Sequence, residues 1–453
     1  MKALVLGLGK SGESASKLLE DNGYEVIKVD DKLSKYNYKL EGKLPSDLSF
    51  IVVSPAVGLN HKIIKQAKKQ KIEVIGELEL SSRICTCDIL AVTGTNGKTT
   101  TTTLLSKLCS TSFKTFVGGN IGIPFADFVG DTKFEDKVVL EVSSFQLETM
   151  KFFKPHIACI LNFSSDHLNR YKNLKNYIKT KLNIFKNMNS NDYAVLNADD
   201  AIVMKNVKNL SCKTYYFSTK KQVVGCFTEN GIIYFKDNKN NITKICKTNC
   251  LKIVGDHNLS NALCAICMYL LAGGDVKRIK NVLTNFYGVE HRLQYVASLN
   301  KVDFYNDSKA TNPQSTIVAI NSFDCQVVLI LGGSDKGFGF DEVFLNIPSN
   351  IIQILVIGEV KDKIIKSAKK FNFENIKVIT SLKQGVNLGY SILKNKGGIV
   401  LLSPATASFD MFSNYEERGK FFVCAVKEKI KNETKQSKNK SKCKTKTKTK
   451  SKD

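Results

Sequence analysis

The chain has 453 residues, of which 43% are hydrophobic, and its formal net charge at pH 7 is +25. This length predicts about three domains, and no apolar run is long enough to span a bilayer. The apolar stretch at the N-terminus is too short and too rich in glycine for a signal peptide, so we expect a cytoplasmic protein without a transmembrane segment. The 13 cysteines follow no repeated spacing, which favours free thiols over a cysteine metal site.

Much of the positive charge lies at the C-terminus, in residues 432–453. From residue 434 the chain reads TKQSKNKSKCKTKTKTKSKD, with lysine at nearly every second position and no apolar pattern. Such a composition predicts a disordered tail. The tail could be a solvated extension, or it could bind an anionic membrane surface or nucleic acid. Because aromatic residues do not alternate with the lysines, we expect no specific nucleic-acid binding.

Residues 1–87 alternate between predicted strands and helices. The strands are expected at 2–6, 25–29, 50–53 and 72–75, and the helices at 11–22 and 61–71, which is typical of a parallel, Rossmann-like sheet. The turn GLGKSG places Gly9 and Ser11 at a helix N-terminus, where a diphosphate could bind. Asp30, at the end of the next strand, could accept hydrogen bonds from ribose hydroxyls. Ser54 begins a second loop at this edge, and either a dinucleotide or a sugar nucleotide would fit the pattern.

Residues 88–110, DILAVTGTNGKTTTTTLLSKLCS, combine a buried strand, a glycine-rich loop and a helix. This order predicts a phosphate-binding loop, although Val92 stands where the full Walker pattern has glycine. Lys98 would reach the β- and γ-phosphates of ATP, and the Thr99 hydroxyl would bind Mg²⁺. The predicted ATP-binding residues of this loop are Gly94, Thr95, Asn96, Gly97, Lys98, Thr99 and Thr100.

Further polar side chains follow the next strands, which are expected at 113–117, 138–142 and 157–161. Asn120, Glu141, Asp166 and His167 stand at or just beyond the ends of these strands, and such ends meet at one edge of a parallel sheet. Because Mg²⁺ is held by few protein ligands beside phosphates, Glu141 and His167 are candidate metal ligands.

Strand and helix alternation starts again after residue 290. Three strand-end loops carry Lys309, Lys336 and Ser408. Two cations and a hydroxyl at one sheet edge suit a dicarboxylate or a phosphate.

The motifs, in chain order, resemble those of one family, the ATP-dependent Mur ligases. They are GTNGKTT, GGNIG, EVSSFQLE, DHLNRY, GDHNLSNAL, NDSKATNP, LGGSDKG and LLSPATASFDMFSNYEERG. The resemblance extends to about residue 430. The last motif and GLGKSG resemble the family member that joins D-glutamate to UDP-N-acetylmuramoyl-L-alanine, an amide-forming step of peptidoglycan precursor synthesis that passes through an acyl phosphate.

The resemblance implies an α/β protein with three domains. Residues 1–87 would form a Rossmann-like domain for the UDP-linked substrate, 88–289 a central P-loop ATPase-type domain, and 290–431 a Rossmann-like domain that holds the amino acid. The protein would act as a monomer with ATP, two Mg²⁺ ions and a CO₂-derived carbamate on Lys181. The residues that the resemblance makes catalytic are Lys98, His167 and Lys181.

The resemblance also implies ligand contacts for each domain. Thr99, Glu141, His167 and carbamylated Lys181 would hold the metal ions. Asn258, Arg292 and Asp307 would join the loop residues in binding ATP, and Gly9, Ser11, Asp30, Ser54 and Asn120 would bind the UDP-linked substrate. The residues expected to hold D-glutamate are Lys309, Thr311, Lys336, Ser408, Phe409 and Tyr415.

Three alternatives are left open by the sequence. A related ligase could add L-alanine, a diamino acid or a folate-linked glutamate, although the motif around residues 408–415 argues against this. An oxidoreductase could bind NAD at the GLGKSG turn, but Lys98 and the later loops would then have no role. A nucleic-acid-binding protein would depend on the tail. Within the ligase hypothesis, either His167 or the carbamate on Lys181 could take the proton of the amine.

Overall fold

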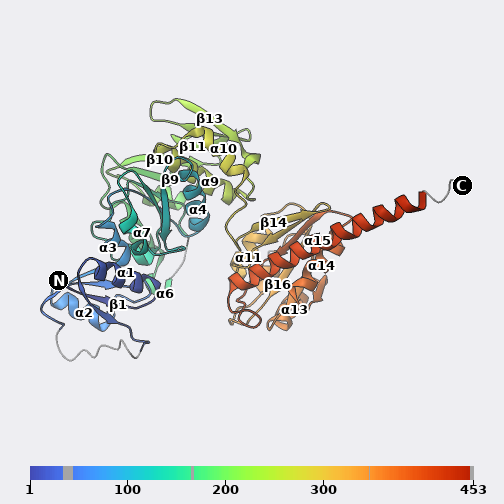
Figure 1. Ribbon diagram of the computed structural model, residues 1–453, viewed down its shortest axis with the longest axis horizontal. Helices are drawn as coiled ribbons and strands as arrows, with labels where there is room; N and C mark the ends of the chain where they lie inside the picture. Colours follow the sequence, from blue (N-terminus) through green and yellow to red (C-terminus); the bar gives the residue numbers. More distant parts are fainter. Residues whose placement is uncertain (34–43, 165–167, 346, 449–453) are drawn as a thin grey trace. The chain divides into compact units, whose positions relative to one another are not determined.

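The computed structural model describes residues 1–33, 44–164, 168–345 and 347–448 (Figure 1). The chain forms two compact units: Met1–Leu251 with His257–Asn285, and Lys252–Asp256 with Phe286–Asp453. The first unit holds two β-sheets and the second unit holds one. The expected mixed α/β fold with mainly parallel sheets is confirmed. The division into three domains at residues 87 and 289 stays a prediction, since the first two sheets share one compact unit.

The first sheet has four parallel strands in the order β2-β1-β3-β4. α2 covers one face of this sheet. The other face packs against α1, and its apolar residues belong to the same hydrophobic core as residues of the second sheet. Its strands are β1 (Lys2–Leu6), β2 (Glu25–Val29), β3 (Leu48–Val53) and β4 (Glu73–Gly76), and its helices are α1 (Lys10–Asp21), α2 (Lys62–Lys69) and α3 (Glu77–Ser82).

The second sheet has nine strands in the order β13-β12-β11-β10-β9-β8-β5-β7-β6. The strands are parallel from β6 to β11, and β12 and β13 add an antiparallel margin. The strands are β5 (Asp88–Thr93), β6 (Thr115–Gly119), β7 (Lys137–Glu141), β8 (Ile157–Ile160), β9 (Tyr193–Asn197), β10 (Lys213–Ser218), β11 (Gly225–Glu229), β12 (Ile232–Lys236) and β13 (Ile242–Lys247). The helices are α4 (Lys98–Cys109), α5 (Ser144–Leu147), α6 (Leu168–Tyr171), α7 (Leu174–Leu182), α8 (Ala201–Asn206), α9 (Asp256–Leu271) and α10 (Val276–Thr284).

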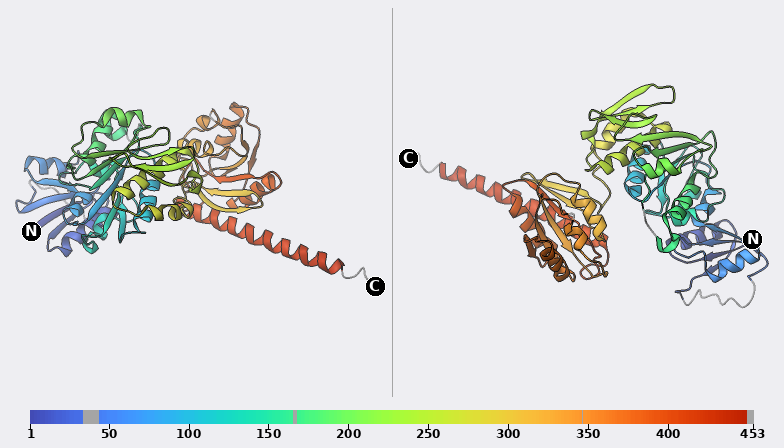
Figure 2. Two further views of the ribbon diagram at one scale, coloured as in Figure 1. Left: turned by 90° about the horizontal axis from the view of Figure 1, so that it is seen from above. Right: turned by 180° about the vertical axis from the view of Figure 1, so that it is seen from behind.

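The third sheet has six strands in the order β14-β15-β19-β16-β17-β18, and only its edge strand β14 is antiparallel. Helices α11 to α13 pack on one face, while α14 and the start of α15 pack on the other (Figure 2). The strands are β14 (Gln294–Leu299), β15 (Val302–Asn306), β16 (Val327–Gly332), β17 (Ile351–Ile357), β18 (Ile376–Val378) and β19 (Gly398–Leu402). The helices are α11 (Pro313–Ile320), α12 (Asp341–Leu345), α13 (Lys361–Lys370), α14 (Leu382–Leu393) and α15 (Tyr415–Lys448).

The C-terminal segment differs from the expected disordered tail, because α15 continues to Lys448 (Figure 1). Its first turns are anchored, since Phe422, Ala425 and Val426 are buried against the third sheet. Beyond Gly419 the chain contains neither proline nor glycine, the two residues that most disfavour a helix interior. No helix in the described ranges is long and apolar enough to cross a membrane.

Candidate active site

The predicted phosphate loop lies between the end of β5 and the start of α4. Gly94 and Gly97 adopt φ values of 151° and 84°, which residues with a side chain rarely adopt. A Cβ atom at Gly97 would also lie 2.3 Å from Oδ1 of Asn261 on α9. Lys98 begins α4 and turns back over the loop, donating from Nζ to the carbonyl oxygens of Gly94 at 3.0 Å and Thr95 at 2.8 Å. Gly97 caps α4 without a side-chain hydrogen bond, which suits an anion at this helix N-terminus.

A segment that follows β8 holds this loop in place. The backbone N–H of Asn96 donates to Oδ1 of Asn162 at 2.9 Å, and Nδ2 of Asn162 donates to the Asn96 carbonyl at 3.1 Å. The Thr95 hydroxyl accepts from the backbone N–H of Ser164 at 3.0 Å. Sequence reasoning missed Asn162 as a site residue. It directly follows the strand expected at 157–161, but no motif rule gives an asparagine there a role.

Glu141 ends β7, and in the sheet it is paired with Val92 of β5, close to the loop. Its side chain is 2% exposed. Oε1 accepts from Nδ2 of Asn120 at 2.8 Å, whereas Oε2 is buried with no hydrogen-bond partner among the described residues. A buried acceptor without a partner is costly, and a cation would satisfy it. The residues present therefore fit a Mg²⁺ ligand role for Glu141.

Lys181 reaches the same loop from α7. Its side chain is 1% exposed, and Nζ donates to the Gly94 carbonyl at 2.9 Å and to the Thr93 hydroxyl at 3.2 Å. The ammonium also lies 4.9 Å from the ring centroid of Tyr177, whose hydroxyl contacts the Thr95 hydroxyl at 3.3 Å. The structure thus brings Lys181 to the phosphate loop. Its carbamylation stays a prediction.

The expected metal ligand His167, with its neighbour Asp166, lies outside the described residues. Within the described ranges, no three or more histidine, cysteine, aspartate or glutamate side chains form a cluster that could hold a metal ion. The described part of the expected ligand set is therefore Thr99, Glu141 and Lys181.

The residues expected to bind the UDP-linked substrate lie at the carboxyl edge of the first sheet, apart from Asn120. Asp30 follows β2, and its carboxylate accepts from the backbone N–H of Leu8 at 2.7 Å and of Lys32 at 2.8 Å. These backbone hydrogen bonds lower the pKa of Asp30, so the carboxylate is charged and shapes the glycine turn. Gly9 caps α1, Ser11 lies in its first turn, and Ser54 follows the neighbouring strand β3.

In the second unit, the expected nucleotide-binding residues lie around the end of β15. Asp307 is buried, and it accepts from the Ser403 hydroxyl at 2.8 Å and from the backbone N–H of Leu293 at 3.1 Å. Burial raises the pKa of Asp307 to about 7. Nε of Arg292 and Nε2 of His291 are buried without a hydrogen-bond partner in the described part of the chain. Asn258, expected to bind ATP as well, belongs to α9 of the first unit.

The loops expected to hold D-glutamate meet within the second unit. The Nζ atom of Lys309 lies 5.5 Å from the ring centroid of Tyr415. The loop that carries Lys336 is joined to the one that carries Ser408 by a bridge between Ser334 and Ala407. Ser408 is buried, while the other expected residues there, Thr311, Lys336 and Phe409, are partly or fully exposed.

Arg418 joins two of these loops, and sequence reasoning did not single it out. Its buried guanidinium donates from Nε to the Ser308 hydroxyl at 2.9 Å and from Nη1 to the Ala407 carbonyl at 2.9 Å. Nη2 donates to the carbonyls of Ser308 and Thr406 at 2.8 and 3.1 Å. Burial lowers its pKa to about 10, yet it stays charged at neutral pH. Arg418 therefore fixes the loop after β15 against the loop after β19.

The chain matches family models over most of these elements. The Mur ligase middle domain matches residues 92–269, and the Mur ligase glutamate ligase domain matches residues 291–406. UDP-N-acetylmuramoylalanine–D-glutamate ligase of Caldicellulosiruptor bescii is 40% identical, with 94% of this chain and 97% of that protein covered. The enzyme of the same name from Thermoanaerobacter sp. strain X514 is 41% identical, with 94% of this chain and 98% of that protein covered.

Solved structures of similar fold include two from Thermotoga maritima. UDP-N-acetylmuramate-alanine ligase MurC has a TM-score of 0.59 at 19% identity, with 95% of this chain and 100% of that chain covered. The MurF ligase in complex with ADP has a TM-score of 0.57 at 17% identity, with 95% of each chain covered. The chain belongs to the Mur ligase family. It is an ATP-dependent ligase that forms an amide bond, which excludes the oxidoreductase alternative.

Proposed function

We propose that this ligase joins D-glutamate to UDP-N-acetylmuramoyl-L-alanine in peptidoglycan precursor synthesis. The observation that carries the proposal is the set of groups around the phosphate loop. Lys98 and Lys181 both donate to the Gly94 carbonyl, and one buried oxygen of Glu141 on the neighbouring strand has no hydrogen-bond partner among the described residues. Relatives that cover 94% of this chain carry this enzyme's name, which supports the choice of substrates.

The reaction must make a carboxylate electrophilic. In the proposed reaction, an oxygen of the acceptor carboxylate first attacks the γ-phosphorus of ATP, so that an acyl phosphate forms and ADP leaves. The amine of D-glutamate then attacks the carbonyl carbon, which forms the C–N bond and a tetrahedral oxyanion, and inorganic phosphate leaves when this oxyanion collapses to the amide. Lys98 and the N–H groups at the start of α4 would stabilise charge on the transferred phosphoryl group.

Two Mg²⁺ ions would be held by Thr99, Glu141, His167 and carbamylated Lys181. Bound Mg²⁺ would offset the negative charge that builds up between the carboxylate and the phosphoryl group. The amine must also lose a proton, and His167 or the carbamate on Lys181 would accept it. The burial of Lys181 supports its role, since a carboxylate formed on it would lie beside the phosphate loop and away from bulk water.

The remaining assignments follow from the same proposal. The edge of the first sheet, with Gly9, Ser11, Asp30 and Ser54, would bind the UDP-linked substrate, to which Asn120 would also contribute. Asn258, Arg292 and Asp307 would bind ATP, and the joined loops of the second unit would bind D-glutamate. We also propose that the enzyme is a monomer and is cytoplasmic, where ATP and nucleotide-linked precursors are available.

Phosphate release from ATP tests the proposal directly. The purified chain would be incubated with ATP, Mg²⁺, UDP-N-acetylmuramoyl-L-alanine and one amino acid at a time. We expect D-glutamate to support turnover, and L-glutamate, L-alanine and meso-diaminopimelate to stay near background. Turnover with another amino acid would keep the ligase and overturn the assignment of the second unit's loops. A folded protein that binds ATP but turns over none of them would refute the proposed substrates.

A further inference from the structure

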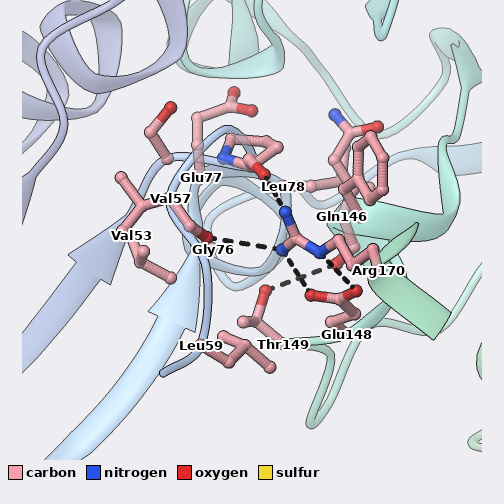
Figure 3. A pocket seen from close by; sticks show the side chains of 13 residues that line it. Val53, Val57, Leu59, Gly76, Glu77, Leu78, Gln146, Glu148, Thr149 and Arg170 are labelled. Atoms are coloured by element: carbon pink, nitrogen blue, oxygen red, sulfur yellow. Dashed lines mark hydrogen bonds and ion pairs between the residues drawn. The ribbon is translucent and has the colours of Figure 1, made fainter. Parts of the chain in front are cut away.

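Arg170 lies on the short helix α6, three residues after His167, and makes a two-pronged ion pair. Nε donates to Oε1 of Glu148 at 2.9 Å, and Nη2 donates to Oε2 of Glu148 at 2.6 Å (Figure 3). Its guanidinium carbon also lies 4.5 Å from the ring centroid of Phe145. Glu148 and Phe145 belong to the segment that leaves β7 just after Glu141. Arg170 therefore connects the segment that follows the expected metal ligand His167 with the segment that follows the expected metal ligand Glu141.

The same guanidinium also binds the first sheet. Nη1 donates to the Pro55 carbonyl at 3.1 Å, and Nη2 donates to the Val57 carbonyl at 3.3 Å. Both carbonyls belong to the loop 54–58, which follows β3. All of these groups lie in the first compact unit, around a small pocket lined by the ends of β3 and β4, the loop after β3, and the segment that follows β7 (Figure 3).

The loop 54–58 packs directly on the glycine turn before α1. A Cβ atom at Gly7 would lie 2.8 Å from Cγ2 of Val57 and 2.9 Å from Cβ of Ser54. Any shift of the loop would therefore press on the turn that carries Gly9. A continuous series of contacts thus runs from Glu148 through Arg170 and Val57 to this turn.

Cohesion between the two sheets depends mainly on other groups. The fully buried carboxylate of Glu79 accepts from the backbone N–H groups of Lys151, Phe152 and Phe153, and one apolar core extends across both sheets. The side chain of Arg170, by contrast, is 22% exposed. Its two-pronged pair with Glu148 adds to this cohesion, and its hydrogen bonds to the Pro55 and Val57 carbonyls also fix where the loop 54–58 lies.

We infer that Arg170 is a positioning residue that sets the loop 54–58 and the glycine turn against the Glu141 edge of the second sheet. Its ligand class is a carboxylic acid linked to a nucleoside diphosphate. The diphosphate would be held at the edge of the first sheet, and the carboxylate at the other end of the same molecule must reach the phosphate loop. The position of the first sheet's edge relative to the Glu141 edge therefore determines where this carboxylate lies. A planar guanidinium can bind one carboxylate and two carbonyls together, whereas lysine lacks this fork. This inference rests on the proposed function.

The test compares Arg170→Lys with a matched control, Arg83→Lys. Arg83 lies near the same sheet junction, with a side chain 29% exposed, and makes its own two-pronged pair with Glu73. It does not contact the loop 54–58 in the described structure. The measurements are kcat, the KM for UDP-N-acetylmuramoyl-L-alanine, the KM for D-glutamate, the dissociation constant of ATP, and the melting temperature.

We expect Arg170→Lys to raise the KM for the UDP-linked substrate about tenfold or to lower kcat to a similar extent, because small misplacements of reacting groups are costly. ATP binding should change by less than about twofold, and Arg83→Lys should leave all kinetic constants within about twofold. Glu148→Gln should reproduce the kinetic defect of Arg170→Lys, and combining the two should add little, because they break one connection.

Two results would overturn the inference. One is wild-type kinetics in both Arg170→Lys and Glu148→Gln. The other is a loss that affects ATP, D-glutamate and the UDP-linked substrate equally, with a fall in melting temperature like that of Arg83→Lys, since this indicates a purely structural role. A wild-type protein that binds the UDP-linked substrate but makes no product with D-glutamate would refute the proposed function alone. Binding of that substrate to each variant would then decide the inference.

Discussion

Replacing Glu141 with glutamine separates a metal-binding role from a structural one, because the two roles predict opposite changes in stability. Oε1 keeps a partner in Asn120, while Oε2 is buried with none among the described residues. Leaving such a group unsatisfied costs about 1–3 kcal/mol, and more when it is charged. Removing the charge should therefore raise the free energy of unfolding of the metal-free protein by about 1 kcal/mol. Turnover should fall by about 10² or more, since a metal ligand is lost.

Urea unfolding with and without Mg²⁺ measures both effects. A ligand that binds only the folded state stabilises it, so Mg²⁺ should raise the unfolding midpoint of the wild-type protein and much less that of Glu141→Gln. Glu135→Gln, at an exposed position, is the control and should stay within about 0.5 kcal/mol of wild type. A lower stability of metal-free Glu141→Gln would refute the reasoning, because it would mean that Oε2 makes a favourable contact in solution.

Three further predictions follow. Lys181→Ala should nearly abolish phosphate release, and added small carboxylates should partly restore it, whereas Lys179→Ala should behave like wild type; near-full activity of Lys181→Ala without rescue would disprove its metal role. Burial raises the pKa of Glu77 from 4.5 to about 7, so the folded state binds this proton more tightly than the unfolded state. The free energy of unfolding should therefore fall as pH rises between these values, by up to about 3 kcal/mol. Urea unfolding at pH 5 and pH 8 measures this fall, which should be weaker in Glu77→Gln. Removing residues 434–453 should leave turnover unchanged in the phosphate-release assay, and a loss of activity would show that the tail takes part in the reaction.

Much of the phosphate loop was predictable because its signal is local. Glycine at positions 94 and 97, lysine at 98 and a flanking strand and helix specify a backbone shape within a few residues. The convergence of Asn120 and Glu141 was also predictable, since strands of a parallel sheet end at the same edge. The placement of Lys181 came from the family resemblance and not from local rules, because only the tertiary fold brings α7 to the loop.

The residues that sequence reasoning missed act by joining segments that are distant in the chain. Asn162 and Arg418 bind mainly backbone groups, and Arg170 binds two backbone carbonyls beside Glu148; a backbone carbonyl has no sequence signature. No strand was expected at β9, β13 or β14; of these, β13 and β14 lie at the edges of their sheets, where strands have little apolar periodicity to detect. At the C-terminus, the charge pattern indicated disorder, but α15 begins buried on the third sheet and continues to Lys448 through a segment without proline or glycine.

The close approach of Gly97 to Asn261 bears on how the site can change during evolution. A Cβ atom at position 97 would lie 2.3 Å from the end of the Asn261 side chain, so a substitution at position 97 requires that this side chain move or be replaced. The positive φ of Gly97 limits the choice further, to residues such as asparagine or aspartate that accept a left-handed conformation. Because α9 also carries Asn258, such a change would reach the expected adenosine contact as well. In a library randomised at both positions, functional variants with a substitution at position 97 should therefore be enriched in changes at position 261.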